Sequence, residues 1–371
     1  MDSVDLRKRN FVTPTEMPYK LASGVNLTSG EFANTLDLAV EKSSCRVAAV
    51  PRPGKLRGKG LGYYVESSGG GPEEEARITV RDDGVVDVVV GTFSHGQGHR
   101  TTYSQILADQ LGIDFDKINV IQGDTDLVKF GGGTGGSRSS QMGGIAVKKA
   151  CEAMLEDASS IAADLLQVLR ETVRYADCAF TTSENQSRVT LAQVASAASE
   201  PQFGGAGLTK LLRYDRGGGF TFPNGCHVCE VEIDTDTGHI EILRYTAVDD
   251  CGRVINPLLA SGQVHGGVAM GIGQTLLEHA VYDADGQLLS GSLMDYAMPR
   301  ASHMSDIDVS INEVLDPNNE LGIKGIGEGG ACGAPPAVVN AVINALSPLG
   351  ITSVDMPLTS ESIWRMITSR G

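Results

Sequence analysis

The residues of this chain that could do chemistry gather in three glycine-rich loops. The first loop, residues 91–98, places Gln97 between Gly96 and Gly98, and a helix is expected to follow directly. A side-chain amide both donates and accepts hydrogen bonds, and glycines let another molecule approach the backbone closely. The N-terminus of the following helix favours an anionic or oxo ligand. A turn that only caps the helix accounts for the same residues equally well.

The second loop, residues 131–140, reads Gly-Gly-Gly-Thr-Gly-Gly-Ser-Arg-Ser-Ser and also precedes a helical pattern. Its backbone N–H groups, its hydroxyls and the guanidinium of Arg138 converge before the positive end of a helix dipole. Such a combination cradles a phosphate group. The alternative is a flexible linker, which is disfavoured because the helical pattern resumes immediately.

The third loop, residues 322–330, sets the single carboxylate of Glu328 among closely spaced glycines, with Lys324 nearby. Bulky neighbours are few, so a substrate or cofactor can reach this carboxylate. Limited solvation would raise its pKa toward the range of a general base. A loop glutamate exposed to water is the equally simple alternative.

Other motifs in the chain favour structure over chemistry. Residues 234–238 resemble half of a calcium loop, but strand patterns flank them, so a hairpin turn is expected. Cys226 and Cys229 lack a second ligand pair for zinc, and on a strand they would face opposite sides. The Gly-x-Gly-x-x-Gly patterns at Gly131 and Gly325 lie outside any compact βαβ unit and do not indicate a dinucleotide fingerprint.

The loops need a framework of helices and strands to position them. Hydrophobic periodicity predicts helices at 30–42, 101–111, 141–175, 258–277, from Pro335 onward, and near 359–369. Strands are predicted at 76–80, 85–90, 118–122, 228–233, 240–248 and 307–314. Because these elements lack regular βαβ alternation, the predicted fold class is α+β.

The same patterns predict two lobes after an N-terminal segment. Residues 1–75 are expected to be an irregular segment and join, residues 76–225 a first lobe, and residues 226–371 a second lobe that carries Glu328. A patch rich in Gly and Phe, residues 202–225, is the expected boundary between the lobes.

Composition excludes several classes of protein. Thirty Lys and Arg against 46 Asp and Glu give a net charge of −16, which disfavours binding to nucleic acid or to an anionic membrane surface. The uncharged stretch 329–354 is broken by prolines and is too short to span a bilayer. Seven scattered cysteines and no secretory signal indicate a reducing compartment, the cytoplasm. The 46 glycines demand either many left-handed positions or many close backbone approaches.

The three loops, in this order, resemble the molybdenum hydroxylase family, which includes xanthine dehydrogenase, aldehyde oxidoreductase and the large subunit of aerobic carbon monoxide dehydrogenase. The resemblance covers nearly the whole chain. It is carried by Gly-Gln-Gly-His at 96–99, Gly-Asp-Thr-Asp at 123–126, Gly-Thr-Gly-Gly-Ser-Arg-Ser at 133–139, Gly-Cys-His-Val at 225–228, Gln-Val-His-Gly-Gly at 263–267 and Lys-Gly-Ile-Gly-Glu at 324–328. It implies the two-lobed, C-terminal molybdopterin-binding domain of the xanthine dehydrogenase and aldehyde oxidase type. It also offers a reason for the glycine excess, because many backbone segments of the family lie against one extended pterin dinucleotide.

Only the second half of the family's molybdenum subunit is matched. The Gly-rich loop with a Phe and the Arg-Gly-Phe-Gly segment of the first half are missing. The resemblance therefore implies a split medium subunit, as in nicotinate dehydrogenase, or a truncated product, and a second molybdopterin-binding chain that completes the site. It places the [2Fe-2S] clusters on an iron–sulfur subunit and the FAD on another partner, since no four-Cys cluster motif is present here.

The resemblance also assigns roles to individual positions. Glu328 matches the family's catalytic general base, and Gln97 matches the glutamine near the apical oxo ligand of the metal. Gln263 and Lys324 lie in matching motifs, and no residue is a metal ligand. Residues that match segments around the pterin and its pyrophosphate are Gly96, Gly98, His99, Thr134, Gly135, Ser137, Arg138 and Ser139.

The implied cofactor is molybdenum-molybdopterin in its cytosine dinucleotide form. The implied reaction oxidises a small molecule with water as the source of oxygen. Residues 334–336, Ala-Pro-Pro, look like the branches of the family that oxidise aldehydes and N-heterocycles. Two other functions stay open: a non-catalytic or truncated scaffold subunit of the same fold, and a phosphate-cradling binding module unrelated to molybdenum.

Overall fold

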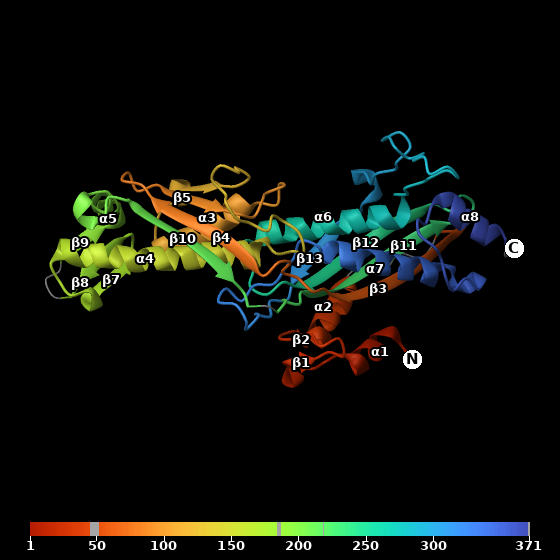
Figure 1. The fold of residues 1–371 in the computed structure, drawn as a ribbon. Coiled ribbons are helices and arrows are strands. Elements are labelled where there is room, and N and C mark those ends of the chain that lie inside the picture. The colour runs from red at the N-terminus through yellow and green to blue at the C-terminus, as the bar shows by residue number, and fades with distance from the viewer. Residues whose placement is uncertain (45–51, 184–186, 218, 370–371) are drawn as a thin grey trace. The chain divides into compact units, whose positions relative to one another are not determined.

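The computed structural model describes residues 1–44, 52–183, 187–217 and 219–369, and its contacts divide them into two compact units (Figure 1). Unit 1 comprises residues 1–67, 221–317 and 324–371, and unit 2 comprises residues 68–220 and 318–323. The contacts thus group the N-terminal residues with the C-terminal part of the chain. The three predicted segments, with boundaries at 75 and 225, stay a prediction about domains.

Unit 1 is built on a four-stranded sheet in the order β13-β12-β11-β3, in which β13 alone runs parallel to its neighbour. The strands are β3 (Lys55–Val65), β11 (Asn224–Asp234), β12 (Ile240–Asp250) and β13 (Ile307–Ile311). The helices are α1 (Ser3–Asn10), α2 (Phe32–Ser44), α6 (Pro257–Leu276), α7 (Gly329–Leu346) and α8 (Ser360–Thr368), and β1 (Tyr19–Lys20) pairs with β2 (Asn26–Leu27) in a separate ribbon.

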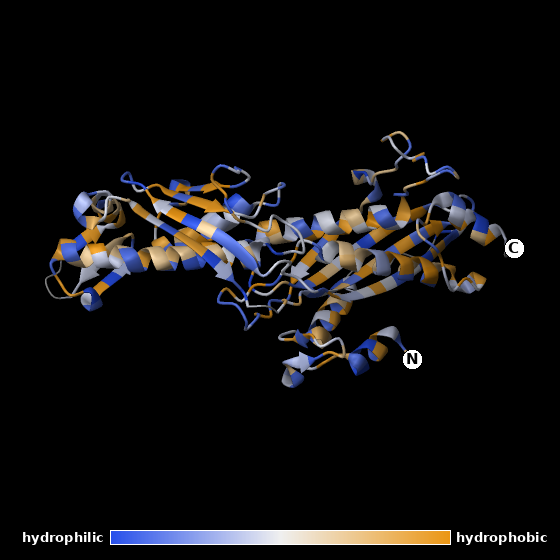
Figure 2. Cartoon of the chain, viewed as in Figure 1, coloured by the Kyte–Doolittle hydropathy of each residue, from blue (hydrophilic) through white to orange (hydrophobic). Residues whose placement is uncertain are grey.

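Apolar side chains of β11 are buried on both faces of this sheet, and orange and blue bands alternate along the strands of unit 1 in Figure 2. Cys229 and Val231 point into the main core with α6 and α7, whereas Cys226 and Val228 pack against α2 on the opposite face. Side chains of successive strand residues point to opposite faces, which explains this division. The prediction that Cys226 and Cys229 face opposite sides is confirmed.

Glycines on β3 let α7 lie directly on the sheet. Gly58, Gly60 and Gly62 share one face of the strand, and a Cβ atom on Gly60 would lie 2.0 Å from the backbone nitrogen of Ala341. No side chain fits at that distance, so these positions require glycine. Part of the glycine excess therefore serves helix-on-sheet packing within the protein, which the sequence analysis did not predict.

Unit 2 contains a four-stranded sheet in the order β10-β4-β5-β6 and a small sheet in the order β7-β8-β9. The strands are β4 (Glu73–Val80), β5 (Val86–Val90), β6 (Ile118–Ile121), β7 (Val173–Ala176), β8 (Ala179–Thr182), β9 (Arg188–Thr190) and β10 (Leu208–Asp215). The helices are α3 (His99–Leu111), α4 (Ile145–Leu166) and α5 (Leu191–Ala198), and a π-helical turn, Ser139–Gly144, leads into α4.

The predicted fold class, α+β, is confirmed, but several predicted boundaries were wrong. The helix predicted at 141–175 ends at Leu166, because Gln167 takes a left-handed conformation with φ of +54°, and β7 follows. The helix predicted from Pro335 begins at Gly329 and runs through both prolines. Strand β3 occupies a segment predicted to be irregular, and β10 lies in the patch predicted to be the boundary between the lobes. Among the described residues no helix combines the length and apolarity that crossing a bilayer requires.

Candidate functional site

Two glycine-rich loops of unit 2, residues 91–98 and 131–139, pass each other with their backbones in contact. A Cβ atom on Gly131 would lie 2.4 Å from the Cα atom of Gly91, and the reverse distance is the same. Only two glycines allow two chains to cross this closely. The crossing brings together the first two of the three loops singled out in the sequence.

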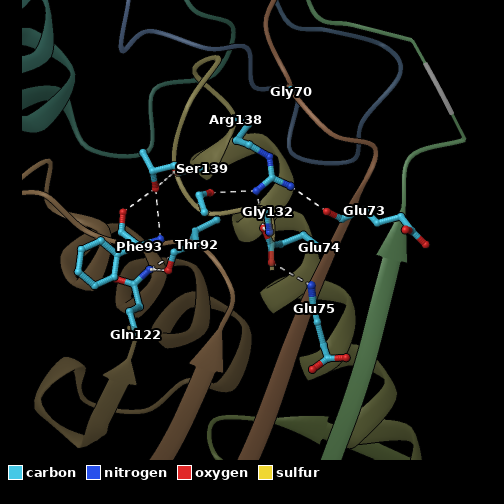
Figure 3. Close-up of polar contacts among 12 residues, drawn as sticks. Gly70, Glu73, Glu74, Glu75, Thr92, Phe93, Gln122, Gly132, Arg138 and Ser139 are labelled. Carbon is cyan, nitrogen blue, oxygen red and sulfur yellow. Dashed lines mark hydrogen bonds and ion pairs between the residues drawn. The ribbon is translucent and has the colours of Figure 1, made fainter. Parts of the chain in front are cut away.

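Side chains then join the two loops (Figure 3). The hydroxyl of Thr134 donates to the backbone carbonyl of Phe93 at 2.5 Å and accepts from the backbone N–H of the same residue at 3.2 Å. It also lies 3.0 Å from the hydroxyl of Ser139. Thr134 and Ser139, both predicted to hold a ligand, therefore also fix the shape of the paired loops.

The outer surface of the paired loops is open backbone. No atom lies within 4 Å of the position of a Cβ atom on Gly96, Gly133 or Gly135. Gly96 and Gly133 have φ values of +107° and +64°, which only glycine adopts without strain. A ligand can therefore approach these backbone N–H groups as closely as the predicted phosphate cradle requires.

The helix that follows the first loop begins with a left-handed cap. Gly98 precedes α3 with φ of +81° and ψ of +26°. In the second loop Ser137 also has a left-handed backbone, with φ of +51°, which is uncommon for a residue with a side chain. Both predicted residues thus lie at sharp changes of chain direction next to the open glycines.

Arg138 lies beneath the second loop, where its guanidinium pairs with a buried carboxylate (Figure 3). Its Nη1 atom is 2.5 Å from Oε2 of Glu74, and both side chains are almost completely buried. The same guanidinium donates to the backbone carbonyls of Gly133 at 3.0 Å and Glu73 at 2.7 Å. The positive charge of Arg138, which was predicted to bind a phosphate, is therefore compensated by the carboxylate of Glu74. Arg138 instead holds the second loop in place.

Gln97 is half-buried in the first loop. Its Oε1 atom accepts a hydrogen bond from the backbone N–H of His95, while its Nε2 atom lies 3.5 Å from the carbonyl of Phe93. The strong contact orients the amide through its oxygen. The amide nitrogen, held only by the long contact, is the group with hydrogens to donate to a ligand.

His99, the first residue of α3, is buried behind the loops instead of facing a ligand. Its Nδ1 atom lies 3.3 Å from Nε2 of Gln122, and its ring stacks beside Tyr103 with 5.5 Å between centroids. Burial lowers the pKa of His99 to about 4, and the nearby His95 adds to this effect. The ring is therefore neutral at pH 7 and supports the loops through packing.

Arg216 is a residue that the sequence analysis missed. It follows β10, within the patch predicted to be a boundary. Its side chain packs over Gly69 and donates a hydrogen bond to the backbone carbonyl of Gly70 at 3.4 Å. It forms no ion pair with a carboxylate in the part of the chain that the structure describes, and burial lowers its pKa with a contribution from nearby Arg138. Arg216 thus supplies positive charge beside the second loop that Arg138, paired with Glu74, does not.

Glu328 lies in unit 1, immediately before the first residue of α7, and its side chain is exposed. The exposed carboxylate is compatible both with a base that a substrate can reach and with the simpler alternative of a loop glutamate open to water. The limited solvation expected from its neighbours is not seen, because glycines leave the side chain open to water.

Lys324, four residues earlier, faces inward. Its ammonium is 2.6 Å from Oδ2 of Asp250, and both side chains are completely buried. The carboxylate of Asp250 also accepts hydrogen bonds from the side-chain amide of Asn224 at 2.9 Å and from the N–H of Gly252 at 2.9 Å. Lys324 therefore anchors the third loop to the end of β12.

The N-terminus of α7 rests on a buried hydrogen-bond network. The hydroxyl of Tyr64 donates to Oδ1 of Asp249 at 2.8 Å, and Nε2 of His227 lies 3.1 Å from the same oxygen. A Cβ atom on Gly329 would lie 2.2 Å from the Tyr64 hydroxyl, and one on Gly333 would lie 2.5 Å from Nδ1 of His227. The two glycines thus seat the helix on this network, which fixes where Glu328 emerges.

On its other side α7 contacts α6. A Cβ atom on Gly330 would lie 2.6 Å from the backbone carbonyl oxygen of Val264, and one on Gly267 would lie 2.9 Å from the nitrogen of Ala331. Gln263 lies one turn before Gly267 on α6 and is half-buried. The structure therefore brings the predicted residues of unit 1 to one region, where α6 and α7 pack closely.

Comparison with known proteins assigns the chain to a family. The sequence profile of the molybdopterin cofactor-binding domain matches residues 37–305, which is more than half of the chain. The chain belongs to the molybdopterin-binding subunits of the molybdenum hydroxylase family. The resemblance inferred from the three loops is confirmed.

Two curated members of the molybdenum hydroxylase family show the extent of the match. The large chain of carbon monoxide dehydrogenase from Hydrogenophaga pseudoflava is 33% identical over 99% of this chain. The large subunit of nicotine 6-hydroxylase from Paenarthrobacter nicotinovorans is also 33% identical, over 97% of this chain. This chain spans 48% and 47% of their respective lengths, so it corresponds to about half of each relative.

A solved structure of the family shows the same fold. Carbon monoxide dehydrogenase from Oligotropha carboxidovorans matches 100% of this chain and 49% of its own chain, with a TM-score of 0.90 at 30% identity. The predicted two-lobed molybdopterin-binding fold is therefore confirmed.

The residues of this chain fit a molybdopterin cofactor. The open glycines at 96, 133 and 135 form a backbone surface that any Cβ atom would obstruct, which suits an extended, phosphate-bearing group. Arg216 adds a guanidinium without a carboxylate partner among the described residues. No group of three His, Cys, Asp or Glu side chains in the described residues is placed to hold a metal ion.

Proposed function

We propose that this chain is the part of a molybdenum hydroxylase that holds the dinucleotide portion of the cofactor and supplies the catalytic base. The observation that carries the proposal is the pair of crossed loops, with open backbone at Gly96, Gly133 and Gly135, in a chain of this family. The bound form would be molybdenum-molybdopterin cytosine dinucleotide. Gly98, Thr134, Ser137 and Ser139 would line its pterin and pyrophosphate, with Arg138 and His99 supporting them from behind.

The reaction replaces a C–H bond of the substrate with C–OH, using water, and releases two protons and two electrons. When bound, the cofactor supplies the oxygen-transfer chemistry and accepts the two electrons. This chain's own contribution is a proton acceptor: the carboxylate of Glu328, exposed before α7, would take up one released proton. The amide nitrogen of Gln97 would donate a hydrogen bond to an oxygen of the group.

The proposed substrate is an aldehyde or an N-heterocycle. The Ala-Pro-Pro sequence at 334–336 lies in α7, two turns beyond Glu328, and supports this choice. The relative named nicotine 6-hydroxylase is as similar to this chain as the relative named carbon monoxide dehydrogenase.

The proposed assembly contains a second molybdopterin-binding chain, an iron–sulfur subunit and an FAD subunit. The supporting observation is that this chain matches about half the length of its relatives. Gln263 and Lys324 would position the part of the site that this chain contributes. All six cysteines that the structure describes are free thiols, which supports a cytoplasmic location.

Affinity purification from the native host, followed by elemental analysis, tests the proposal. We expect molybdenum and iron to co-elute with the chain and with further polypeptides. An ordinary nucleotide bound without molybdenum would support the phosphate-binding alternative instead. A folded chain in a metal-free complex would support a scaffold subunit and would contradict the catalytic assignment of Glu328.

A further inference from the structure

Helix α6 lacks the charged face of a normal surface helix. None of its 20 residues is Asp, Glu, Lys or Arg. Its inner side packs into the core through Val264, Val268 and Ile272. Its outer side exposes Leu258 and Met270, which are 82% and 64% accessible. Because exposed helix faces are usually charged or polar, this face is suited to contact with protein.

The outer face of α6 also carries two glycines, which have no side chains. Gly262 and Gly266 lie between Leu258 and Met270 at intervals of four residues, which places all four on one side of the helix. No atom lies within 4 Å of the position of a Cβ atom on either glycine. These four residues form an uncharged stripe with an apolar side chain at each end.

The segment after α6, residues 277–300, ends in an apolar turn. The hydroxyl of Ser292 donates to Oδ2 of Asp295 at 2.6 Å, and the N–H of Tyr296 donates to the carbonyl of Ser292 at 2.8 Å. Between them Leu293 and Met294 are 78% and 96% accessible. Turn tips favour Gly, Asn, Asp and Ser, so two large, exposed apolar residues are unusual on a hydrogen-bonded turn. We call this exposed pair the Leu293–Met294 knob.

The segment that carries the knob packs against α6 near the end of that helix. Residues 277–300 return to α6, where a Cβ atom on Gly273 would lie 2.8 Å from the side chain of Pro299. Other exposed apolar side chains of the segment are Tyr282, Leu288, Leu289 and Met298.

We propose that this surface, formed by the outer face of α6 and the Leu293–Met294 knob, docks the polypeptide that corresponds to the other half of the molybdenum subunit. The matched relatives carry about as much additional chain as this chain supplies, within the same polypeptide. A second copy of this chain is a poorer occupant, because two chains of net charge −16 repel each other. The uncharged stripe suits a complementary apolar partner that excludes water.

The test uses the full chain and, as a separate polypeptide, the other half of the subunit recovered from the native complex. Binding is measured for wild type, Met294→Glu and the control Leu169→Glu. Leu169 is a comparably exposed leucine, 70% accessible, in unit 2. We expect Met294→Glu to weaken binding at least tenfold, with the same melting temperature for the isolated variant as for wild type. Leu169→Glu should bind like wild type.

Several outcomes overturn the docking surface. Equal binding by Met294→Glu and wild type, or absence of binding by wild type, would contradict it. Self-association of the wild-type chain that Met294→Glu abolishes would assign the surface to a second copy. Because the identity of this partner rests on the proposed function, molybdenum is measured in every complex. If complex formation depends on Met294 but the complex holds no molybdenum, the interface stands and the proposed function is contradicted. If the complex contains molybdenum but forms equally well with Met294→Glu, the proposed function stands and the interface is contradicted.

Discussion

The ammonium of Lys324 lies 2.6 Å from the carboxylate of Asp250, with both side chains completely buried. Burial raises the pKa of Asp250, although the adjacent ammonium and the N–H of Gly252 act in the opposite direction. A buried carboxylate is tolerated only while it is paired and hydrogen-bonded. The ion pair thus fixes the start of the loop that leads to Glu328. The charge of Lys324 is compensated by Asp250 and is not directed at a ligand.

Removing one partner of this pair should destabilise the chain even without cofactor. We expect Lys324→Met to lower the free energy of unfolding by about 3–5 kcal/mol, because the carboxylate is left buried and unpaired. Adding Asp250→Asn should restore part of the loss. Urea denaturation checks this, with Lys59→Met as control: the Lys59 ammonium is exposed and lies 3.6 Å from Glu230, a contact worth at most about 1 kcal/mol. Equal losses for Lys324→Met and Lys59→Met would contradict the structural role.

Two glycines of the second loop should separate folding from cofactor binding. Alanine at Gly131 would collide with the backbone of Gly91, so Gly131→Ala should destabilise the chain by about 1–3 kcal/mol. Alanine at Gly135 meets no atom within 4 Å, so Gly135→Ala should melt like wild type. The assembled Gly135→Ala complex should nevertheless contain less molybdenum, because the methyl group occupies the open backbone surface. Full molybdenum content in that variant would contradict the proposed cradle.

Sequence patterns located the loops because glycine spacing and the following helices are local features. Gln97 and Thr134 lie at the paired loops, as their motifs predicted, and the hairpin of β11 and β12 follows from simple alternation. The direction in which a side chain faces is not local. The side chain of Arg138 faces inward because it pairs with the buried carboxylate of Glu74, 64 residues earlier on β4. No local sequence motif indicates this pairing.

The sequence left two explanations of the glycine count open, left-handed positions and close backbone approaches, and the structure contains both. Gly96, Gly133 and Gly135 provide open backbone, as a ligand site requires. Gly60 and Gly330 instead admit neighbouring backbone in the interior, where β3 supports α7 and α7 meets α6. The glycine spacing of two residues along β3 was the available signal for that packing. It was missed because residues 1–75 were predicted to be irregular.

His99 should make stability depend on pH. Its pKa is lowered by burial to about 4, so between about pH 6.5 and pH 4 the unfolded chain binds a proton that the folded chain does not. The folded state therefore loses stability as the pH falls through this window, at up to about 1.4 kcal/mol per pH unit from this residue. Urea titrations at several pH values should show a shallower dependence for His99→Gln than for wild type. The exposed His239→Gln variant should keep the wild-type slope, and an unchanged slope in His99→Gln would contradict the burial of a neutral ring.

Glu328→Gln should abolish most activity of the assembled enzyme without affecting its assembly. The amide keeps the size of the side chain but has no carboxylate to accept a proton, and a positioned base contributes about 10²–10⁴-fold to rate. Because Glu328 is exposed and glutamine keeps the size of its side chain, the variant should melt like wild type and retain its molybdenum. We would measure kcat, melting temperature and metal content on the same preparation. Wild-type kcat with full molybdenum would contradict the role of Glu328 as the base, whereas loss of molybdenum together with kcat would assign it to cofactor retention instead.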